Sequence, residues 1–449
     1  MALPILAWAG EGMDSFLDDL RKRIKRKEIK IAVVGLGYVG LPLAIEFTKK
    51  GFSVLGIDID KDRINHIKKR ESYITDVKTE ELKKVLATGR FSAQRDFSAI
   101  KAAEVIIICV PTPLKKKYHP NISYIKQAVK GISRYFKKGS LVILESTTYP
   151  GTTQEVILPL LEQNNLKHGK DFYLCFSPER IDPGNKKYSV SKIPKIVGGI
   201  NREAASLATL VYQNIINRVV PVSSTTVAEA VKLLENTFRL INIGLIDELA
   251  MMCHKMNIDI WEVIEAAKTK PFGFMPFYPG PGVGGHCIPK DPLYLYWKAR
   301  HHGFKSRFIK LASDIITSMP EYVTERVINL LKKGNGELNK MRVLVIGVTY
   351  KKDIKDLRKS PALDIIDIFQ KRNISVSYYD PLIPYLKLNH LINFKSIDLN
   401  KNNLSRFDCV VIATDHSTLD YDFILKNSKL ILDTRNVYRA IKANKVIKL

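Results

Sequence analysis

A glycine-rich turn between a buried strand and a helix constrains the fold of this chain more than any other feature. Residues 29–34 have the pattern of a buried strand, residues 35–40 read Gly-Leu-Gly-Tyr-Val-Gly, and residues 41–50 have the pattern of a helix. A second strand at 53–57 ends in Asp58. Glycines at this spacing allow a tight turn, close approach of a pyrophosphate and close packing of the helix on the strand. This succession predicts a βαβ unit that binds a dinucleotide.

The acidic residue at the end of the second strand indicates which dinucleotide is bound. A carboxylate there accepts hydrogen bonds from ribose hydroxyls and repels a 2′-phosphate, so Asp58 favours NAD over NADP. The helix N-terminus adds free N–H groups and a positive dipole end for the phosphates. The alternative, a glycine turn in an unrelated βαβ unit, is disfavoured because strand, turn, helix, strand and acid all occur in order. The residues expected to contact the cofactor here are Gly35, Gly37, Tyr38, Val39, Gly40, Asp58 and Arg63.

More strands followed by polar residues occur along the first half of the chain. Buried runs at 104–110, 141–144 and 172–176 each end in a polar or proline-containing segment. In a doubly wound sheet, ligands bind at the carboxyl ends of the strands. Each polar residue alone could equally be turn chemistry or a helix cap. The site candidates from these segments are Thr112, Thr147, Glu179 and Arg180.

Cys287 lies in a loop, residues 280–291, that is too rich in glycine for a helix or strand interior. Such a backbone lets a ligand approach closely, and Lys290 and Asp291 add a cation and a carboxylate next to the thiol. A nucleophilic thiol in a chain that binds a hydride acceptor indicates an oxidation through a thioester. A free thiol titrates near pH ~8.5, so a nearby cation would have to lower its pKa. Lys290, Lys232 and a protonated His286 are the candidates, although we expect His286 to be a structural or substrate contact rather than the base.

Together with Cys287 the chain has five cysteines, an odd number. They lie far apart in the sequence and show no CxxC pairing. This argues against a disulfide scaffold or a structural zinc site and predicts a reducing cytoplasm, with no metal. Buried small hydrophobes are the expected role of these four residues, Cys109, Cys175, Cys253 and Cys409.

Apolar residues recur at spacings of three and four from Val227 to Met252, which predicts one long helix that joins two domains and packs against a partner subunit. Lys232 and Asn236 are one turn apart and share a face of it. A lysine can stabilise an alkoxide and an asparagine can orient a hydroxyl or a water. A solvated polar face is the alternative.

The C-terminal part opens with a second strand and glycine at 341–347, but the rest of the glycine pattern is replaced by Val-Thr-Tyr-Lys-Lys at 348–352. Further strands are expected at 374–379, 409–412 and 430–432. The sequence therefore predicts an α/β protein with two Rossmann-like doubly wound domains joined by a long central helix. Two such domains with a thiol loop between them indicate two nucleotide-bearing ligands that meet at one site.

The net charge of +26 raises nucleic acid, anionic lipid or an anionic substrate as partners. Lysines are scattered, and the dense basic run at 21–27 has no interleaved aromatic residues, so an amphipathic N-terminal helix is expected rather than a binding patch.

The sequence contains no run of about 18 apolar residues, so no membrane span is expected. The apolar start lacks a preceding basic region, so no secretory signal is expected, and Met13 is an alternative start to Met1.

The chain resembles the UDP-glucose/GDP-mannose dehydrogenase family over roughly residues 28 to 440. The matching motifs are Gly35-Leu-Gly-Tyr-Val-Gly40, Ser146-Thr147, Ser177-Pro-Glu179, Lys232-Leu-Leu-Glu-Asn236, Gly284-Gly-His-Cys-Ile-Pro-Lys-Asp291 and Val345-Ile-Gly-Val-Thr-Tyr-Lys351. The segments 180–185 and 270–282 are most similar to the branch that acts on UDP-N-acetylglucosamine. The domains implied are an N-terminal extension at 1–27, a NAD-binding domain at 28–222, a central helical domain with the catalytic loop at 223–330, and a UDP-sugar-binding domain at 331–449.

The resemblance implies a reaction in which C6 of the sugar is oxidised twice, from alcohol to acid, with two NAD. Cys287 would form a thiohemiacetal and then a thioester, Lys232 would stabilise the oxyanion, and Asp291 would act in proton transfer. Asn236 and Thr147 would position substrate or water, and Glu179 would support the water or the substrate loop. The further cofactor contacts implied are Thr112, Thr147, Lys290 and Arg358. The substrate contacts implied are Glu179, Arg180, Lys232, Asn236, Phe277, Tyr278, Gly284 and Lys351.

Several alternatives stay open at this point. UDP-glucose dehydrogenases carry a second glutamate where this chain has Pro183, which we interpret as a mark of the N-acetyl sugar branch. UDP-N-acetylmannosamine and UDP-glucose remain possible substrates, because epimers differ by one hydroxyl. A hydroxy-acid dehydrogenase would need neither the Cys287 loop nor a third domain, and a basic nucleic-acid-binding protein or a non-catalytic homologue is disfavoured. We expect a homodimer or higher homo-oligomer.

Overall fold

The computed structural model divides into two compact units, Met1–Leu234 and Glu235–Leu449, each described here by itself. Met1, Met13 and Pro183 lie outside the described residues. The structure describes residues 15–74, 76–115, 119–163, 165–180, 190–332, 337–388 and 391–449.

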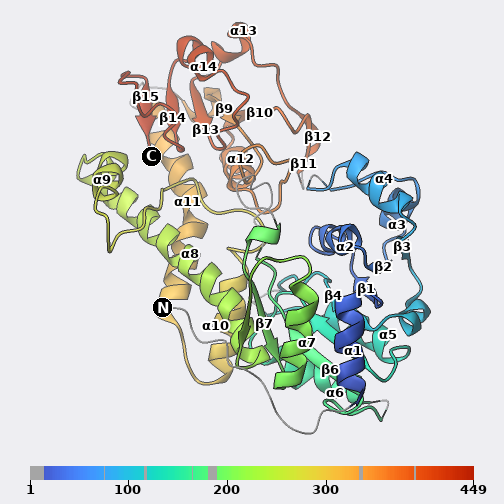
Figure 1. The fold of residues 1–449 in the computed structure, drawn as a ribbon. Coiled ribbons are helices and arrows are strands. Elements are labelled where there is room, and N and C mark those ends of the chain that lie inside the picture. The colour runs from blue at the N-terminus through green and yellow to red at the C-terminus, as the bar shows by residue number, and fades with distance from the viewer. Residues whose placement is uncertain are drawn as a thin grey trace. The chain divides into compact units, whose positions relative to one another are not determined.

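The first unit is built on an eight-stranded sheet with strand order β3-β2-β1-β4-β5-β6-β7-β8 (Figure 1). The chain fills one side of β1 and then crosses to β4 on the other side, which is the doubly wound arrangement. All neighbouring strands are parallel except β6 and β7. The strands are β1 Lys30–Val34, β2 Ser53–Ile57, β3 Phe91–Gln94, β4 Val105–Ile108, β5 Ser140–Leu144, β6 Phe172–Phe176, β7 Lys195–Gly199 and β8 Val219–Val222.

Both faces of this sheet are covered, because successive side chains of a strand point to opposite faces. Ile31 and Val33 belong to one buried cluster, and Ala32 and Val34 belong to another. Such continuous apolar strands are typical of a sheet buried on both sides. The helices are α1 Ser15–Arg26, α2 Gly40–Lys49, α3 Lys61–Lys68, α4 Thr79–Ala87, α5 Ser123–Ser133, α6 Leu158–Glu162 and α7 Arg202–Tyr212, with short turns at Phe97–Ala102, Thr153–Ile157 and Val190–Lys192.

The basic residues of the run that lie within α1, up to Arg26, form its polar face, as expected for an amphipathic helix. Leu17, Leu20 and Ile24 recur at helical spacing and are buried in the same cluster as β1. The Arg23 guanidinium donates to Glu104 Oε1 at 3.0 Å. The run is therefore accounted for by packing and an ion pair.

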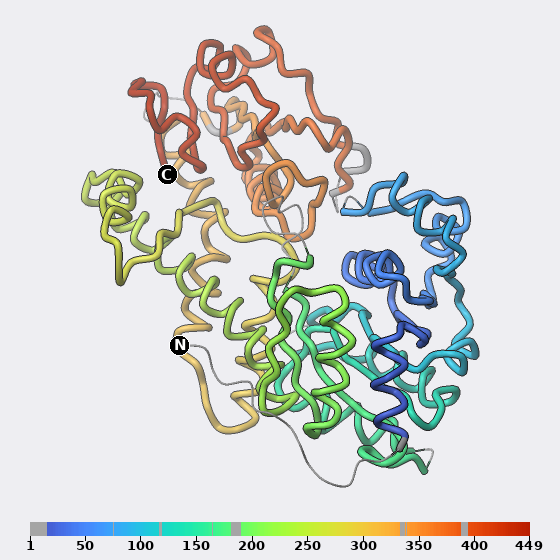
Figure 2. Tube along the Cα trace, in the orientation of Figure 1, coloured from blue at the N-terminus to red at the C-terminus, as the bar shows by residue number. Residues whose placement is uncertain are grey.

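The long helix α8, Thr225–Lys255, is confirmed and spans the division between the two units. In Figure 2 the chain can be followed from the first unit through this helix into the second. Of its apolar residues, Phe238, Leu245 and Met252 are exposed at a spacing of seven. The neighbouring helices of the second unit are α9 Ile260–Ala267, α10 Asp291–His301 and α11 Arg307–Lys332.

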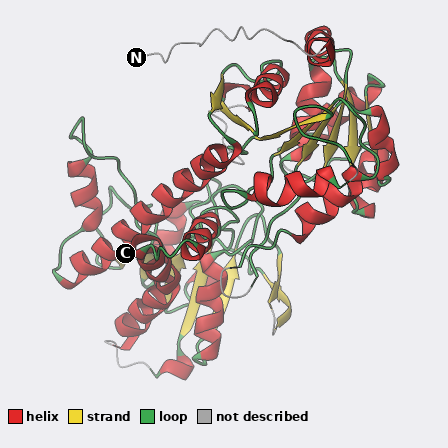
Figure 3. Ribbon diagram, turned by 90° about the horizontal axis from the view of Figure 1, so that it is seen from below, coloured by secondary structure: helices red, strands yellow, loops and turns green. Residues whose placement is uncertain are grey.

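The second unit holds a five-stranded parallel sheet with order β10-β9-β13-β14-β15, again doubly wound. Figure 3 shows the strands of each sheet flanked by helices. The fold class predicted from the sequence is thus confirmed.

The strands of the second sheet are β9 Arg342–Ile346, β10 Ser375–Tyr379, β13 Cys409–Ile412, β14 Ile431–Asp433 and β15 Val446–Lys448. A separate hairpin consists of β11 Tyr385–Leu388 and β12 Leu391–Lys395. The helices are α12 Pro361–Lys371, α13 Lys401–Leu404 and α14 Tyr421–Asn427, with a short turn at Leu338–Lys340. None of the described helices is long and apolar enough to cross a membrane.

Candidate functional site

The three glycines after β1 serve different purposes. Gly35 has a φ of +94°, and a Cβ there would lie 2.7 Å from the carbonyl oxygen of Cys109. A Cβ on Gly40 would lie 1.8 Å from the carbonyl oxygen of Gly35. A Cβ on Gly37 would meet only Arg63 Nη1, at an ordinary 3.8 Å. The protein backbone itself therefore requires Gly35 and Gly40, whereas Gly37 leaves room for a ligand.

Asp58 closes this turn from the end of β2. Its Oδ2 accepts hydrogen bonds from the Leu36 N–H at 2.7 Å and from Arg63 Nη1 at 3.0 Å, and its Oδ1 accepts from the Asp60 N–H at 2.9 Å. Arg63 Nε also lies 3.4 Å from Asp60 Oδ2. Two carboxylates thus balance the charge of Arg63, which agrees with a ribose hydroxyl rather than a 2′-phosphate at this position.

The predicted residues after β4, β5 and β6 lie at the carboxyl ends of these three strands, on the same side of the sheet as the glycine turn after β1. Thr112, Thr147 and Glu179 follow three neighbouring parallel strands, and β1 with its glycine turn is the next neighbour of β4. The carboxyl ends of parallel strands meet at a common edge, where ligands bind. The Arg180 N–H donates to Glu179 Oε1 at 2.6 Å, and Arg180 Nη1 donates to the Pro194 carbonyl at 2.6 Å.

A buried glutamate that the sequence analysis missed connects α8 to this edge. Glu229 accepts hydrogen bonds from the Gly151 N–H at 2.6 Å, and from the N–H and hydroxyl of Thr153 at 2.8 and 2.7 Å. These contacts tie the first turns of α8 to the segment that carries Thr147. Lys232, which is also buried, lies one helical turn beyond Glu229. The sequence signal was a lone acid on the buried side of the helix.

In the second unit, the structure brings together four predicted residues at the start of α10. The N–H groups of Lys290 and Asp291 donate to the carbonyl of Cys287 at 3.1 and 2.8 Å. Asn236 Nδ2 donates to Asp291 Oδ2 at 2.6 Å, and Lys290 Nζ lies 3.5 Å from Asp291 Oδ1. Asp291 is fully buried, while Cys287 is exposed. The turn therefore holds the exposed Cys287 close in the chain to a buried carboxylate that Asn236 and Lys290 contact.

His286 is not a cation at neutral pH. Burial, together with the positive charges of Lys290, Arg358 and Lys359, lowers the pKa of His286 to about 4. Of the three cations considered for activating Cys287, the protonated His286 is therefore wrong. Lys290 lies on the same turn as the thiol and stays a candidate.

The glycines before Cys287 pack against the segment 350–359. A Cβ on Gly284 would lie 2.6 Å from the Lys359 carbonyl oxygen, and the Gly285 N–H donates to the Arg358 carbonyl at 2.8 Å. The Arg358 guanidinium forms a two-pronged pair with Asp356, with Nη2 to Oδ2 at 2.6 Å. The structure thus places Gly284 against Lys359 and Gly285 against Arg358.

The two aromatic residues predicted to contact substrate lie against α8 and α9. The ring of Phe277 packs on Phe238, with centroids 5.8 Å apart. The Tyr278 hydroxyl donates to Glu265 Oε1 at 2.8 Å, and its ring stacks on Trp261. Their contact with substrate stays a prediction.

Asp247 on α8 holds the start of the glycine-rich loop. Its Oδ1 accepts a hydrogen bond from the Gly280 N–H at 3.0 Å, while its Oδ2 is buried with no hydrogen-bond partner among the described residues. Burial raises the pKa of Asp247 to about 8, although the Gly280 N–H and Arg435 act in the opposite direction. The folded protein thus favours the protonated, neutral form of Asp247 up to about pH 8.

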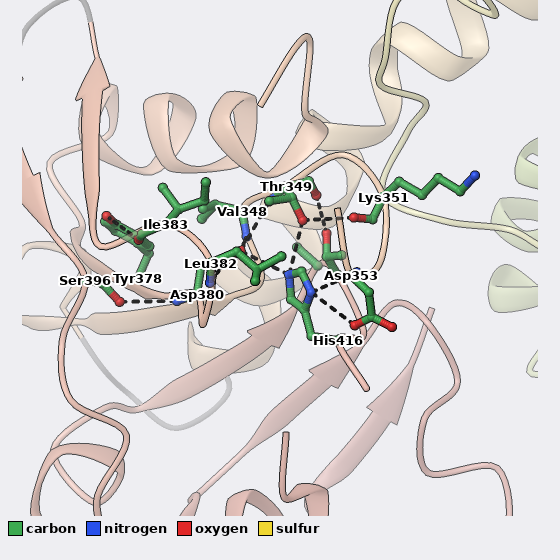
Figure 4. Close-up of polar contacts among 12 residues, drawn as sticks. Val348, Thr349, Lys351, Asp353, Tyr378, Asp380, Leu382, Ile383, Ser396 and His416 are labelled. Atoms are coloured by element: carbon green, nitrogen blue, oxygen red, sulfur yellow. Dashed lines mark hydrogen bonds and ion pairs between the residues drawn. The ribbon is translucent and has the colours of Figure 1, made fainter. Parts of the chain in front are cut away.

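The second sheet repeats the closure seen at Asp58. Gly347 has a φ of +80°, and the Val348 N–H donates to Asp380 Oδ2 at 2.6 Å. Here His416 replaces Arg63 as the partner of the acid, with Nε2 at 3.1 Å from Asp380 Oδ2 (Figure 4). His416 Nδ1 accepts from the Asp353 N–H at 3.0 Å, so a neutral ring carries its proton on Nε2 and donates it to Asp380.

This His416 network, which the sequence analysis also missed, shapes the loop that carries Lys351. The Thr349 hydroxyl lies 3.1 Å from His416 Nε2 and donates to the Lys351 carbonyl at 3.0 Å. Figure 4 shows the side chain of Lys351 pointing away from the network. The loop thus presents Lys351 outward. Among the described residues, no cluster of three or more His, Cys, Asp or Glu side chains could hold a metal ion.

Three models of one family match the chain in order. They are the UDP-glucose/GDP-mannose dehydrogenase family NAD binding domain at residues 29–216, its central domain at 226–316 and its UDP binding domain at 344–440. The chain belongs to the UDP-glucose/GDP-mannose dehydrogenase family. The members are NAD-dependent nucleotide-sugar dehydrogenases, and NAD is the cofactor of this chain. The predicted boundaries at 28–222, 223–330 and 331–449 stay a prediction.

Proteins similar to this chain differ in the sugar that they act on. The chain is 38% identical to UDP-N-acetyl-D-glucosamine 6-dehydrogenase of Pseudomonas aeruginosa over 87% of the chain and 91% of that protein. It is 35% identical to UDP-N-acetyl-D-mannosamine dehydrogenase of Pyrococcus horikoshii over 92% of the chain and 96% of that protein. The solved structure of the Pyrococcus horikoshii UDP-D-ManNAc dehydrogenase has a TM-score of 0.84 and covers 94% of this chain and 98% of its own.

The glycine turn of this family member fits NAD. Val39, the N-cap residue of α2, makes no side-chain hydrogen bond to the first turn, and the space above Gly37 is open. Phosphates bind where backbone N–H groups of a helix start are free of such caps. Gly37 would therefore face the pyrophosphate and Asp58 the ribose.

We expect Gly37→Ala and Gly40→Ala to fail in different ways. Gly37→Ala should fold normally but weaken NAD binding about ten-fold or more, equivalent to roughly 1.4 kcal/mol, because its methyl group occupies the phosphate path. Gly40→Ala should lower the melting temperature even without NAD, because its Cβ collides with the backbone. Calorimetric titration with NAD and thermal unfolding measure the two effects. Tight NAD binding by Gly37→Ala would contradict the assignment.

Asp247→Asn should flatten part of the pH dependence of stability. The folded-state pKa of Asp247 is raised, so its contribution to stability is fully present below its unfolded pKa near 4 and is lost as the pH rises through about 8. Asparagine keeps the acceptor for Gly280 and cannot ionise. The unfolding free energy of the variant should therefore exceed that of wild type increasingly from pH 5 to 8, by on the order of a few kcal/mol. Urea unfolding at each pH tests this, with the exposed Asp314→Asn as the control.

Proposed function

We propose that this chain oxidises C6 of a UDP-N-acetylhexosamine, first of all UDP-N-acetylglucosamine, from the alcohol to the carboxylate. The observation that carries the proposal is the exposed Cys287 thiol on a turn fixed by the N–H groups of Lys290 and Asp291. When bound, NAD accepts a hydride from C6 in each of two oxidations. The protein's own groups must then hold the aldehyde, move the protons and admit water.

Cys287 acts as the nucleophile between the two oxidations. Its thiolate adds to the aldehyde carbon, so a C–S bond forms and the carbonyl oxygen becomes an alkoxide. Lys232, buried on α8, stabilises that oxygen, and groups in this role contribute about 10²–10³-fold to kcat. The positive charge of Lys290 beside the turn favours the thiolate.

Hydrolysis of the thioester restores the thiol. Water forms a C–O bond to the carbonyl carbon, the C–S bond breaks, and the thiolate leaves on Cys287. Glu179 accepts the proton of the attacking water. Asn236, held by Asp291, and Thr147, at the end of β5, position the substrate or the water. Asp291 serves the proton transfers of this turn.

The choice of sugar rests on the sequence rather than on the fold. The segment 270–282 resembles the UDP-N-acetylglucosamine branch, and a relative with that activity is 38% identical. A UDP-N-acetylmannosamine dehydrogenase is 35% identical, so that epimer is the second candidate, and UDP-glucose is the third. The UDP portion is assigned to the second sheet, with Lys351 as a contact. A cytoplasmic location is part of the same proposal.

A panel of UDP-sugars tests this function directly. With NAD in excess, wild type should give two NADH per molecule of its sugar and release the uronic acid, with UDP-N-acetylglucosamine oxidised fastest. Cys287→Ser should lose full turnover, because serine cannot form the thioester. Absorbance at the NADH band and mass analysis of the product measure both. A Cys287→Ser enzyme that still yields two NADH per sugar would show that no covalent intermediate is needed.

We also propose that α8 forms a homodimer interface. Phe238, Leu245 and Met252 are exposed on one face of the helix, where their apolar surface would otherwise meet water. Leu245→Lys should raise the dimer dissociation constant at least about ten-fold, equivalent to roughly 1.4 kcal/mol, because it places a charge in an apolar contact. Mass photometry across protein concentrations measures this, with the exposed Glu248→Gln as the control. A wild type that is monomeric throughout would contradict the proposal.

A further inference from the structure

A buried lysine lies between two carboxylates at the ends of neighbouring strands. Lys195 is the first residue of β7, and its Nζ is 3.1 Å from Glu145 Oε1 and 3.5 Å from Glu179 Oε2. Glu145 directly follows β5, and Glu179 lies just beyond β6. The side chain of Lys195 is only 7% exposed. The first unit thus holds three formally charged side chains close together, and one of them, Glu179, takes part in the proposed reaction.

An aromatic residue completes the surroundings of this lysine. The Lys195 ammonium lies 5.0 Å from the centre of the Tyr212 ring, and the Tyr212 hydroxyl donates to Glu145 Oε1. Glu145 Oε2 is buried and has no hydrogen-bond partner among the described residues. Glu145 is therefore the buried end of the cluster, and Lys195 connects it to Glu179.

The charges of the cluster do not cancel. Two carboxylates share one ammonium group, which leaves one excess negative charge when all three are ionised. Burial and the nearby Glu179 raise the pKa of Glu145 despite Lys195. Burial acts to lower the pKa of Lys195, but the attraction of Glu145 and Glu179 outweighs it, so its pKa is raised. Lys195 therefore stays protonated throughout the working range of pH.

Stability alone is a poor reason for such a group. Replacing a buried ion pair by apolar residues of similar size is often neutral or stabilising, because the charges lose their hydration. A tyrosine ring and buried strands already surround Lys195, so an apolar side chain would pack there. The lysine has a clearer use in what it does to Glu179.

We propose that Lys195 is a positioning residue for hydrolysis of the Cys287 thioester: its ammonium group fixes the orientation of Glu179, the carboxylate that accepts a proton from the attacking water. This inference rests on the proposed function. Glu179 is held at both oxygens, Oε1 by the Arg180 N–H at 2.6 Å and Oε2 by Lys195 at 3.5 Å. Two fixed points set the plane of the carboxylate. Because Glu145 takes the shorter contact, Lys195 does not neutralise Glu179 completely.

The step is balanced in atoms and charge. The attacking water forms the C–O bond, its proton moves to Glu179, and the C–S electron pair leaves with the sulfur of Cys287. Lys195 neither gives nor takes a proton. Its contribution is to hold the Glu179 carboxylate in place and to put a positive charge 3.5 Å from Glu179 Oε2.

Lys195→Met tests the inference, because methionine fills a similar volume without a charge. Hydrolysis should slow about ten- to hundred-fold at neutral pH, which is less than the 10²–10⁴-fold typical of general base catalysis because Glu179 itself remains. Acid-quenched enzyme taken during turnover of the best UDP-sugar of the panel should then carry an acyl group on Cys287 in intact-mass spectra. The acidic limb of the pH–rate profile should move to higher pH, because a carboxylate that loses a neighbouring positive charge holds its proton more tightly. Lys195→Arg keeps the charge and should keep the wild-type pH profile.

Controls separate this role from folding. Lys138→Met removes an exposed lysine that pairs with Asp171, and it should change neither hydrolysis nor the pH profile. If Lys195→Met does not fold, Lys195→Met combined with Glu145→Gln removes one charge of each sign and leaves Glu179 without its lysine. That variant should also accumulate the acyl enzyme.

Two results would overturn the inference. One is a folded variant lacking Lys195 that hydrolyses the thioester at the wild-type rate and with the wild-type pH profile. The other is a slowed variant with no acyl group on Cys287, since the lysine would then act before the thioester forms. Failure of the proposed function looks different: no variant, wild type included, would form the adduct, and Cys287→Ser would still release two NADH.

Discussion

One hydrogen-bonded closure organises both nucleotide-binding sheets of this protein. In each unit, the residue after the first glycine donates its N–H to a carboxylate at the end of the next strand, Leu36 to Asp58 and Val348 to Asp380. In both closures the glycine has a positive φ, +94° at Gly35 and +80° at Gly347. The hydrogen bond thereby sets the point at which the backbone leaves the strand in each unit, and thus where a nucleotide can approach.

The two closures differ in what lies beside the carboxylate. In the first unit Arg63 pairs with Asp58, and Gly37 leaves room for a phosphate to come close. In the second unit the buried His416 takes the place of the arginine and ties down the loop before Lys351. The same strand arrangement therefore serves a dinucleotide in one unit and is rebuilt, with a cation on the loop, for a different nucleotide in the other.

Buried charges in this protein gather where the chain must be held still. Glu229 holds the segment that carries Thr147, Asp291 holds Asn236, and Lys195 holds Glu179. An unpaired polar group in a dry interior is costly, so these pairs tolerate little displacement. Rigid pairs of this kind are a physical basis for positioning reacting groups without adding contacts to the substrate.

The sequence by itself determined the parts that depend on local spacing. Glycine spacing predicted the first turn, apolar periodicity predicted α8, and an i to i+4 pair placed Lys232 and Asn236 on one face. Only the tertiary structure decided the partners of Lys195, Glu229, Asp247 and His416, and β7, the strand that begins with Lys195, was not predicted. Periodicity reports which way neighbouring residues point, whereas a buried charge is stabilised by groups from distant strands, which come together only when the sheet order is set.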